Sequence, residues 1–160
     1  MEIVDIKGKT HNIDCIACSI QNGTIQLPIE RIAETDNFVA EQDLEYPIEG
    51  FVIIASKRHV LSIDEMNDTE LTELTKFLHD LRKVMRSALK ISYVTVIQEE
   101  NTSTSHFHIW LFPWHPWMLK RWKGKVQEVK EIMDYARREM KTQNQLDIVR
   151  KSVDELKKAL

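Results

Sequence analysis

The alternation of apolar and polar residues predicts strands in the first third of the chain. Apolar runs at 29–35, 38–44 and 51–55 have the length and composition of strands. The pair Asp36-Asn37 favours a turn between the first two, because both side chains form local hydrogen bonds with the backbone.

A long helix is predicted next. Asn67 or Asp68 is a suitable N-cap, and apolar residues then recur at intervals of three and four. This stripe must face the core, whereas His79 lies off it and is expected to be solvated. The stripe comprises Leu71, Leu74, Phe77, Leu78, Leu81, Val84, Met85, Ala88 and Leu89.

Two further strands, at 91–97 and 105–112, are expected to pair antiparallel through a polar loop. After Pro113 the chain becomes charged, and two apolar stripes predict two helices that pack on the domain or on a second subunit. We therefore expect an α+β domain with an antiparallel sheet at 1–118 and a helical extension at 119–160. The stripes comprise Val126, Val129, Ile132, Met133, Ala136 and Met140, then Leu146, Val149, Val153, Leu156 and Leu160.

Composition and charge narrow the class of protein. Of the 160 residues, 42% are apolar and 29% are charged, which suits a globular protein. The net charge of −3 argues against bulk attraction to a nucleic acid polymer. No N-terminal run has the length of a signal peptide, and no segment is long and apolar enough to span a membrane. We expect a cytoplasmic protein that binds neither membranes nor nucleic acid polymers.

Cys15 and Cys18 are the only cysteines, and they form a Cys-x-x-Cys pair. In a reducing compartment such a pair is more often a metal or redox site than a disulfide. A redox motif should lie within a parallel βαβ pattern, which this chain lacks. Two interpretations remain open: half of a zinc site, which needs two more ligands, or two unliganded thiols in a loop.

The predicted strand at 105–112 carries histidines at alternate positions. Because side chains alternate along a strand, His106, His108 and Trp110 share one face. The residues between them are apolar and must face the core. Neutral imidazole binds metals, accepts protons or attacks phosphorus. The face with the two histidines is therefore expected to meet a cleft or a ligand.

Several motifs together resemble the histidine triad (HIT) family, named for His-x-His-x-His-x-x with apolar x. The stretch 15–23 is similar to its opening CxxCxIxxG, and 38–44 is similar to its strand that ends in Asp. The stretch 49–59 is similar to GHxLVIPKxH, with Phe51 in place of the first His and Ser56 in place of the Pro.

The resemblance covers roughly 13–118 and implies a five-stranded antiparallel sheet with one long helix, usually in a homodimer. It also implies nucleotide binding and chemistry at an α-phosphate. His108 matches the middle histidine, which attacks phosphorus and forms a covalent nucleotidyl-histidine. Asp43, followed by Leu44, matches the nucleoside-binding position, where a carboxylate can accept two hydrogen bonds from the ribose diol.

The resemblance also supplies the missing metal ligands. In zinc-bearing members the metal is held by the Cys-x-x-Cys pair, by the His of the Lys-x-His motif and by the first triad His. The matching residues are Cys15, Cys18, His59 and His106, a Cys₂His₂ set of the composition expected for structural Zn²⁺. A metal on His106 would also fix the strand that aims the middle histidine.

The polar run before the triad is the expected phosphate-binding segment. Ser103 is the first candidate for a phosphate contact, followed by Asn101 and Gln98. An ordinary hairpin loop is the alternative interpretation of these residues. The attacking nitrogen of His108 must be unprotonated, and a backbone carbonyl bonded to the other ring nitrogen would hold that tautomer.

Trp110 departs from the family pattern. It stands at the third triad position, where hydrolases have His and transferases have Gln, and it has one donor and no acceptor. Our first prediction is a hydrolase acting on a purine nucleoside phosphoramidate or a dinucleoside polyphosphate. The alternatives are a nucleotidyltransferase or phosphorylase, and a nucleotide-binding interaction module with little turnover. Trp114, His115 and Trp117 either contact the leaving group or pack against the C-terminal helices.

Overall fold

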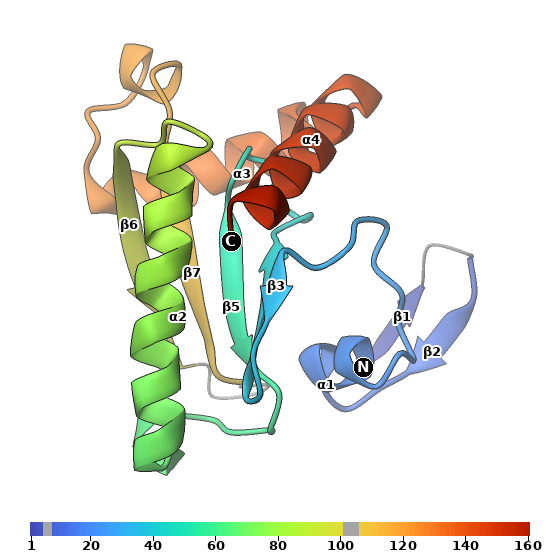
Figure 1. The fold of residues 1–160 in the computed structure, drawn as a ribbon. Coiled ribbons are helices and arrows are strands. Elements are labelled where there is room, and N and C mark those ends of the chain that lie inside the picture. Colours follow the sequence, from blue (N-terminus) through green and yellow to red (C-terminus); the bar gives the residue numbers. More distant parts are fainter. Residues whose placement is uncertain (5–7, 101–105) are drawn as a thin grey trace.

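A computed structural model of the chain describes residues 1–4, 8–100 and 106–160. Its centre is a five-stranded antiparallel sheet with the order β3-β4-β5-β7-β6 and helices on both faces (Figure 1). The predicted α+β fold is therefore confirmed. The strands of this sheet are β3 (Ala33–Glu34), β4 (Phe38–Gln42), β5 (Val52–Ser56), β6 (Tyr93–Gln98) and β7 (His108–Trp114). The other principal elements are β1 (Glu2–Val4), β2 (Thr10–Asn12), α1 (Ile16–Gln21), α2 (Asp68–Ser87), α3 (Val129–Glu139) and α4 (Gln143–Ala159). Short 3₁₀ turns lie at Ile63–Glu65, Met118–Lys120 and Val126–Glu128.

Two strands differ in extent from the sequence pattern. The predicted strand at 29–35 shrinks to β3, because Ile29 and Ile32 both enter the core and residues three apart cannot share one face of a strand. In contrast, β7 continues through Pro113, which has no backbone N–H. The ladder between β5 and β7 ends at the pair Val52 and Leu111, so this proline interrupts no bond to β5.

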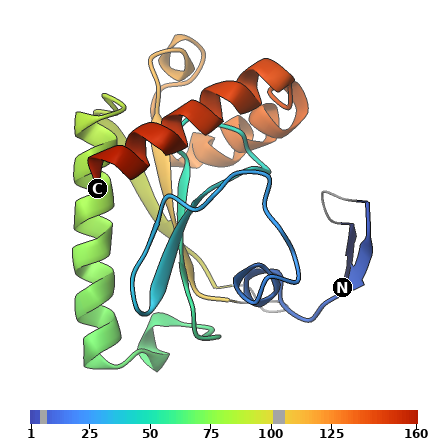
Figure 2. The same ribbon diagram turned by 45° about the vertical axis from the view of Figure 1, so that its right-hand side comes forward.

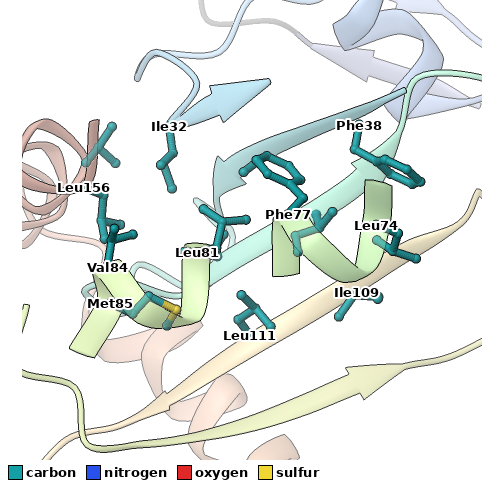
Figure 3. Packing of buried hydrophobic residues seen from close by; sticks show 14 of the residues in the cluster. Ile32, Phe38, Leu74, Phe77, Leu81, Val84, Met85, Ile109, Leu111 and Leu156 are labelled. Atoms are coloured by element: carbon teal, nitrogen blue, oxygen red, sulfur yellow. The ribbon is translucent and has the colours of Figure 1, made fainter. Parts of the chain in front are cut away.

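One face of the sheet is covered by α2 and α4. The helix α2 begins where the sequence predicts, with Asn67 as N-cap in a reciprocal capping box with Glu70. Its apolar stripe packs on the sheet, and Leu156 of α4 joins the same core (Figure 3). The three apolar residues that alternate with the triad positions, which were expected to face the core, lie in this cluster. They are Phe107, Ile109 and Leu111.

The opposite face is covered at one end by α3. Phe112 and Trp114 of β7 pack there with apolar residues of α3 in a second cluster. Trp117 lies against the same cluster, and the His115 Nε2–H donates to the Glu49 carbonyl at 2.8 Å. Of the two interpretations of these aromatic residues, packing against the C-terminal helices is therefore the one that the structure shows.

The helical tail consists of two helices, as predicted, and both pack on the sheet domain. Figure 2 shows α4 crossing the top of the sheet, where its apolar stripe enters the core beside α2. The ends of the predicted stripes are the exceptions, since Val126 and Leu160 are exposed. No helix among the described residues is long and apolar enough to cross a membrane.

The sequence pattern did not predict the hairpin of β1 and β2 or the short helix α1. In Figure 1 these elements lie to one side of the sheet. The helix α1 lacks a usual start signal in the sequence, because its N-cap is Cys15, whose Sγ accepts from the Cys18 N–H.

Candidate metal centre and adjoining pocket

Four potential metal ligands from three separate parts of the chain come together at one end of the sheet. Cys15 and Cys18 lie at the start of α1, His59 follows β5, and His106 precedes β7. Their ligand atoms all lie within 4.8 Å of one another. The Cys₂His₂ group implied by the resemblance is therefore present, and the Cys-x-x-Cys pair has the two further ligands that a zinc site requires.

The spacing of these atoms fits one tetrahedral cation. The Cys15 and Cys18 sulfurs lie 3.3 and 3.5 Å from the Nδ1 of His106. The Nδ1 of His59 lies 3.3 Å from the Cys18 sulfur and 3.1 Å from the Nδ1 of His106. A zinc ion bound at about 2.0–2.3 Å to each ligand separates neighbouring ligand atoms by roughly 3.3–3.8 Å. These four separations are within a few tenths of an ångström of that spacing, and the remaining pairs of ligand atoms lie within 4.8 Å, so the group can close around one Zn²⁺.

The orientation of His106 is set by a carbonyl behind it. Its Nε2 lies 2.7 Å from the Ser56 carbonyl oxygen, which can only accept, so this nitrogen carries the proton. The unprotonated Nδ1 then points at the sulfurs, which is the tautomer that a metal ligand requires. Burial lowers the pKa of His106, which also favours the neutral ring. The Gln21 Nε2–H donates to the same carbonyl at 2.6 Å and ties α1 to β5.

The protonation of the two thiols also bears on metal binding. Burial, followed by the hydrogen bond and charge of Cys15, raises the pKa of the Cys18 thiol to about 11. Two sulfurs at this spacing disfavour being anionic together, and a divalent cation removes that penalty because coordinated thiols are deprotonated.

His108, two residues further along, is oriented differently. Its Nδ1 lies 2.9 Å from the His106 carbonyl oxygen, so Nδ1 carries the proton and Nε2 keeps its lone pair. The side chain is only partly buried and lines a cavity of about 420 Å³. A backbone carbonyl thus fixes an unprotonated nitrogen beside an open space.

This cavity is mostly apolar and is built from several parts of the chain. Ile53 and Ala55 of β5 lie opposite Trp110 and His108 in the ladder, so all four side chains share the cavity face. The cavity lies against α1 and against the segment that follows β4. Apolar lining residues that the sequence did not single out are Ile16, Ala17, Ile20, Leu27 and Val39. Ile20 is the Ile of the CxxCxIxxG-like stretch, whereas the only sequence signal of the others is apolar character, which they share with every core residue.

Asp43 and Leu44 line the same cavity as His108. The Asp43 side chain is 5% exposed, and its Oδ1 accepts from the Tyr46 N–H at 3.0 Å. Burial raises the pKa of this carboxyl to about 6, although backbone N–H groups of Tyr46 and Glu45 oppose the shift. The cavity therefore offers an acidic group at one part of its wall and an unprotonated imidazole at another.

Of the three residues expected to contact phosphate, the structure describes only Gln98. Asn101 and Ser103 lie outside the described residues. Gln98 is not among the residues that line the cavity: it pairs with Ile109, so its side chain lies on the face opposite His108. Its Nε2–H donates instead to the Glu99 carbonyl at 3.3 Å.

Trp110 lies between the imidazole and the second apolar cluster. Its ring centroid is 5.2 Å from that of His108 and 6.1 Å from that of Phe51, which it meets edge-on. It lines the cavity and is only partly buried. Trp110 thus forms an apolar wall beside His108.

Comparisons with known proteins agree with this fold. The chain is 26% identical over 138 residues to an uncharacterized HIT-like protein of Methanocaldococcus jannaschii, covering 79% of this chain and 98% of that protein. No family model matches the chain.

Solved structures with the same fold cover most of the chain. A HIT-like protein of Bartonella henselae has a TM-score of 0.64 at 16% identity, covering 94% of this chain and 99% of that one. A zinc-bound histidine triad family protein of Mycobacterium smegmatis has a TM-score of 0.61 at 16% identity, covering 91% and 97%. A hypothetical histidine triad nucleotide-binding protein of Sulfolobus tokodaii has a TM-score of 0.56 at 22% identity, covering 89% and 94%. The chain therefore has the HIT-like fold, and the resemblance to the histidine triad family is supported.

Proposed function

We propose that this protein is a cytoplasmic, homodimeric, zinc-containing nucleotide hydrolase of the histidine triad family. Its substrate is a purine nucleoside phosphoramidate or a dinucleoside polyphosphate. The observation that carries the proposal is the tautomer of His108: its Nδ1–H is held by a carbonyl at 2.9 Å, which leaves Nε2 unprotonated, and the residue lines the same cavity as Asp43. Nucleotide binding appears in the name of the Sulfolobus tokodaii protein, which shares the fold.

In the proposed reaction, the Nε2 of His108 attacks the α-phosphorus. A phosphorus–nitrogen bond forms, and the bond to the leaving group breaks with its electron pair. Water then attacks the phosphorus of the nucleotidyl-histidine, and the phosphorus–nitrogen bond breaks with its electron pair returning to Nε2. The water loses one proton to the solvent, the nucleoside monophosphate is released, and the neutral imidazole is restored. The carboxylate of Asp43 accepts hydrogen bonds from the ribose hydroxyls, and the apolar wall packs on the base.

The proposed zinc is structural. Cys15, Cys18, His59 and His106 would hold it, and it would supply a rigid link between α1 and the start of β7. Because the His106 carbonyl orients His108, this link also supports the aim of the nucleophile.

Trp110 favours a second candidate. Its indole cannot share a proton with a leaving group as an imidazole can. A nucleotidyltransferase or phosphorylase, which passes the nucleotidyl group to phosphate or a sugar phosphate, is therefore the alternative. A nucleotide-binding interaction module with little turnover is the third candidate.

The test is release of AMP by the purified protein from AMP-phosphoramidate or diadenosine tetraphosphate. We expect release by the wild type, and a drop in rate of at least about 10³-fold in His108→Ala, because the nucleophile is lost. Rapid quenching with denaturant at alkaline pH, which preserves the acid-labile phosphorus–nitrogen bond, should trap a nucleotidyl group on the wild type only. AMP binding without release indicates the interaction module, and release only with added phosphate or sugar phosphate indicates the transferase.

A further inference from the structure

The segment that carries the proposed ribose-binding carboxylate is bound by side chains of the two C-terminal helices. Residues 43–47 leave β4, and this part of the chain, hereafter the nucleoside loop, contributes four residues to the cavity wall. These four are Asp43, Leu44, Glu45 and Tyr46. Side chains of α3, of α4 and of the turn between them contact the loop from outside the cavity.

Arg137 of α3 makes the most extensive of these contacts. Its Nε lies 2.8 Å from a Glu45 carboxylate oxygen, and its Nη2–H donates to the Tyr46 hydroxyl. Its guanidinium carbon also lies 4.7 Å from the centre of the Tyr46 ring, within the range of a cation–π interaction. One planar cation therefore engages two consecutive loop residues, which a single ion pair does not do.

Two further side chains, of Lys141 and Gln145, also contact the nucleoside loop. The Lys141 Nζ lies 2.8 Å from the second Glu45 oxygen, so this carboxylate is bound by two cations. The Gln145 Nε2–H donates to the Pro47 carbonyl at 2.8 Å. The loop is thus contacted at three consecutive residues by groups about 90 to 100 positions later in the sequence.

One of the contacted loop residues is hydrogen-bonded directly to the Asp43 carboxylate. The backbone N–H of Tyr46 donates to the Oδ1 of Asp43 at 3.0 Å, so the residue held by Arg137 is also the residue that orients Asp43. Tyr46 packs in addition on Phe51, with ring centroids 6.2 Å apart, and Phe51 meets Trp110 of the cavity wall.

We propose that Arg137, supported by Lys141, is a positioning residue that sets the affinity of the protein for nucleotides with an intact ribose diol. This inference rests on the proposed function, since it assumes that Asp43 binds ribose. Arg137 and Lys141 touch no substrate themselves: they act by holding Tyr46 and Glu45, and through them the carboxylate. The helical extension is thereby part of the nucleoside site.

The experiment compares AMP with 2′,3′-dideoxy-AMP by isothermal titration calorimetry. The side chains of Arg137, Lys141 and Glu45 are each about half exposed, so each ion pair alone contributes little. We therefore use the double variant R137A/K141A, and expect about a five- to tenfold weaker Kd for AMP from loss of the whole network. The Kd of the dideoxy analogue, which has no diol for Asp43 to bind, should change by less than about twofold. In turnover, KM should rise while kcat stays the same, because the nucleophile is untouched.

The matched control is R150A/K151A, which removes the same charge from α4. Its cations pair with Asp147 and Glu155 of the same helix, not with the nucleoside loop. We expect wild-type affinities for both ligands. Tyr46→Phe, which keeps the ring and removes only the hydroxyl, should give an intermediate loss for AMP and shows the effect without any charge change.

The outcomes are distinguishable. Equal weakening of both ligands, unchanged AMP binding in R137A/K141A and in Tyr46→Phe, or the same loss in the control would each overturn the positioning role. A wild-type protein that binds neither ligand would overturn the proposed function, and the positioning role with it. Circular dichroism and zinc content of each variant identify any loss caused by unfolding.

Discussion

His106 and His108 are two residues apart in the same segment, yet the structure prepares them for opposite tasks. His106 is protonated on Nε2, through the Ser56 carbonyl, and directs Nδ1 at two sulfurs. His108 is protonated on Nδ1, through the His106 carbonyl, and leaves Nε2 unprotonated at the cavity. The first is 7% exposed, whereas the second is only partly buried.

This difference shows that a histidine's chemistry depends on which of its nitrogens meets a carbonyl. The ring itself is the same at both positions, and the carbonyl partners belong to the backbone. The two sites are also coupled in one direction, because the backbone of the metal-site histidine orients the ring of the other. The comparison therefore predicts that a substitution of His106 also disturbs the orientation of His108, whereas a substitution of His108 leaves the metal site intact.

The largest expected effect is on stability at position 106. His106→Ala removes one of four metal ligands, so we expect loss of bound zinc and a fall of at least about 3 kcal/mol in the free energy of unfolding. Elemental analysis and denaturant unfolding measure the two quantities. His108→Ala is the matched variant and should keep both its zinc and its stability. Equal zinc content and stability in the two variants would contradict the assignment.

The second prediction concerns the pH dependence of nucleoside binding by Asp43, which lines the same cavity as His108. The pKa of the Asp43 carboxyl is about 6, so the ribose-binding carboxylate form is lost as pH falls through 6. Adenosine affinity should therefore be constant above pH 7 and about tenfold weaker at pH 5, where roughly a tenth of the groups are ionised. Adenosine is the suitable probe because it has no phosphate that titrates in this range.

Asp43→Asn is the control for this pH profile. The amide cannot ionise, so the variant should bind adenosine weakly and with the same affinity from pH 5 to pH 7. A wild-type profile that is flat between these values, or a variant profile that still falls, would assign the titration to another group.

The smallest expected effect is at Trp110, which contacts the His108 ring. Trp110→His introduces a group that can donate a proton to a leaving amine, so hydrolysis of AMP-phosphoramidate should rise about two- to tenfold. Diadenosine tetraphosphate should respond less, because its polyphosphate leaving group requires no proton at neutral pH. Trp117→His, outside the cavity, is the control. An unchanged ratio of the two rates would show that the third triad position does not supply the proton.

Pattern alone predicted much of the scaffold. The interval between apolar residues predicted α2 and both tail helices, and Asn67 or Asp68 was the predicted N-cap of α2, of which the structure shows Asn67. Both features are predictable because helical spacing and capping are local properties. The pattern overextended the strand before Asp36, where the two core isoleucines break the alternation. The helix α1 was missed because a cysteine sulfur caps it.

For the site, the sequence by itself determined which residue types are available: two thiols, two histidines at alternate positions and an acid after β4. Only the tertiary structure decided their partners. The hydrogen bonds from His106 to the Ser56 carbonyl and from Arg137 to Tyr46 join residues 50 and 91 positions apart. Such contacts depend on how the sheet and helices pack, and neither periodicity nor local propensity carries that information.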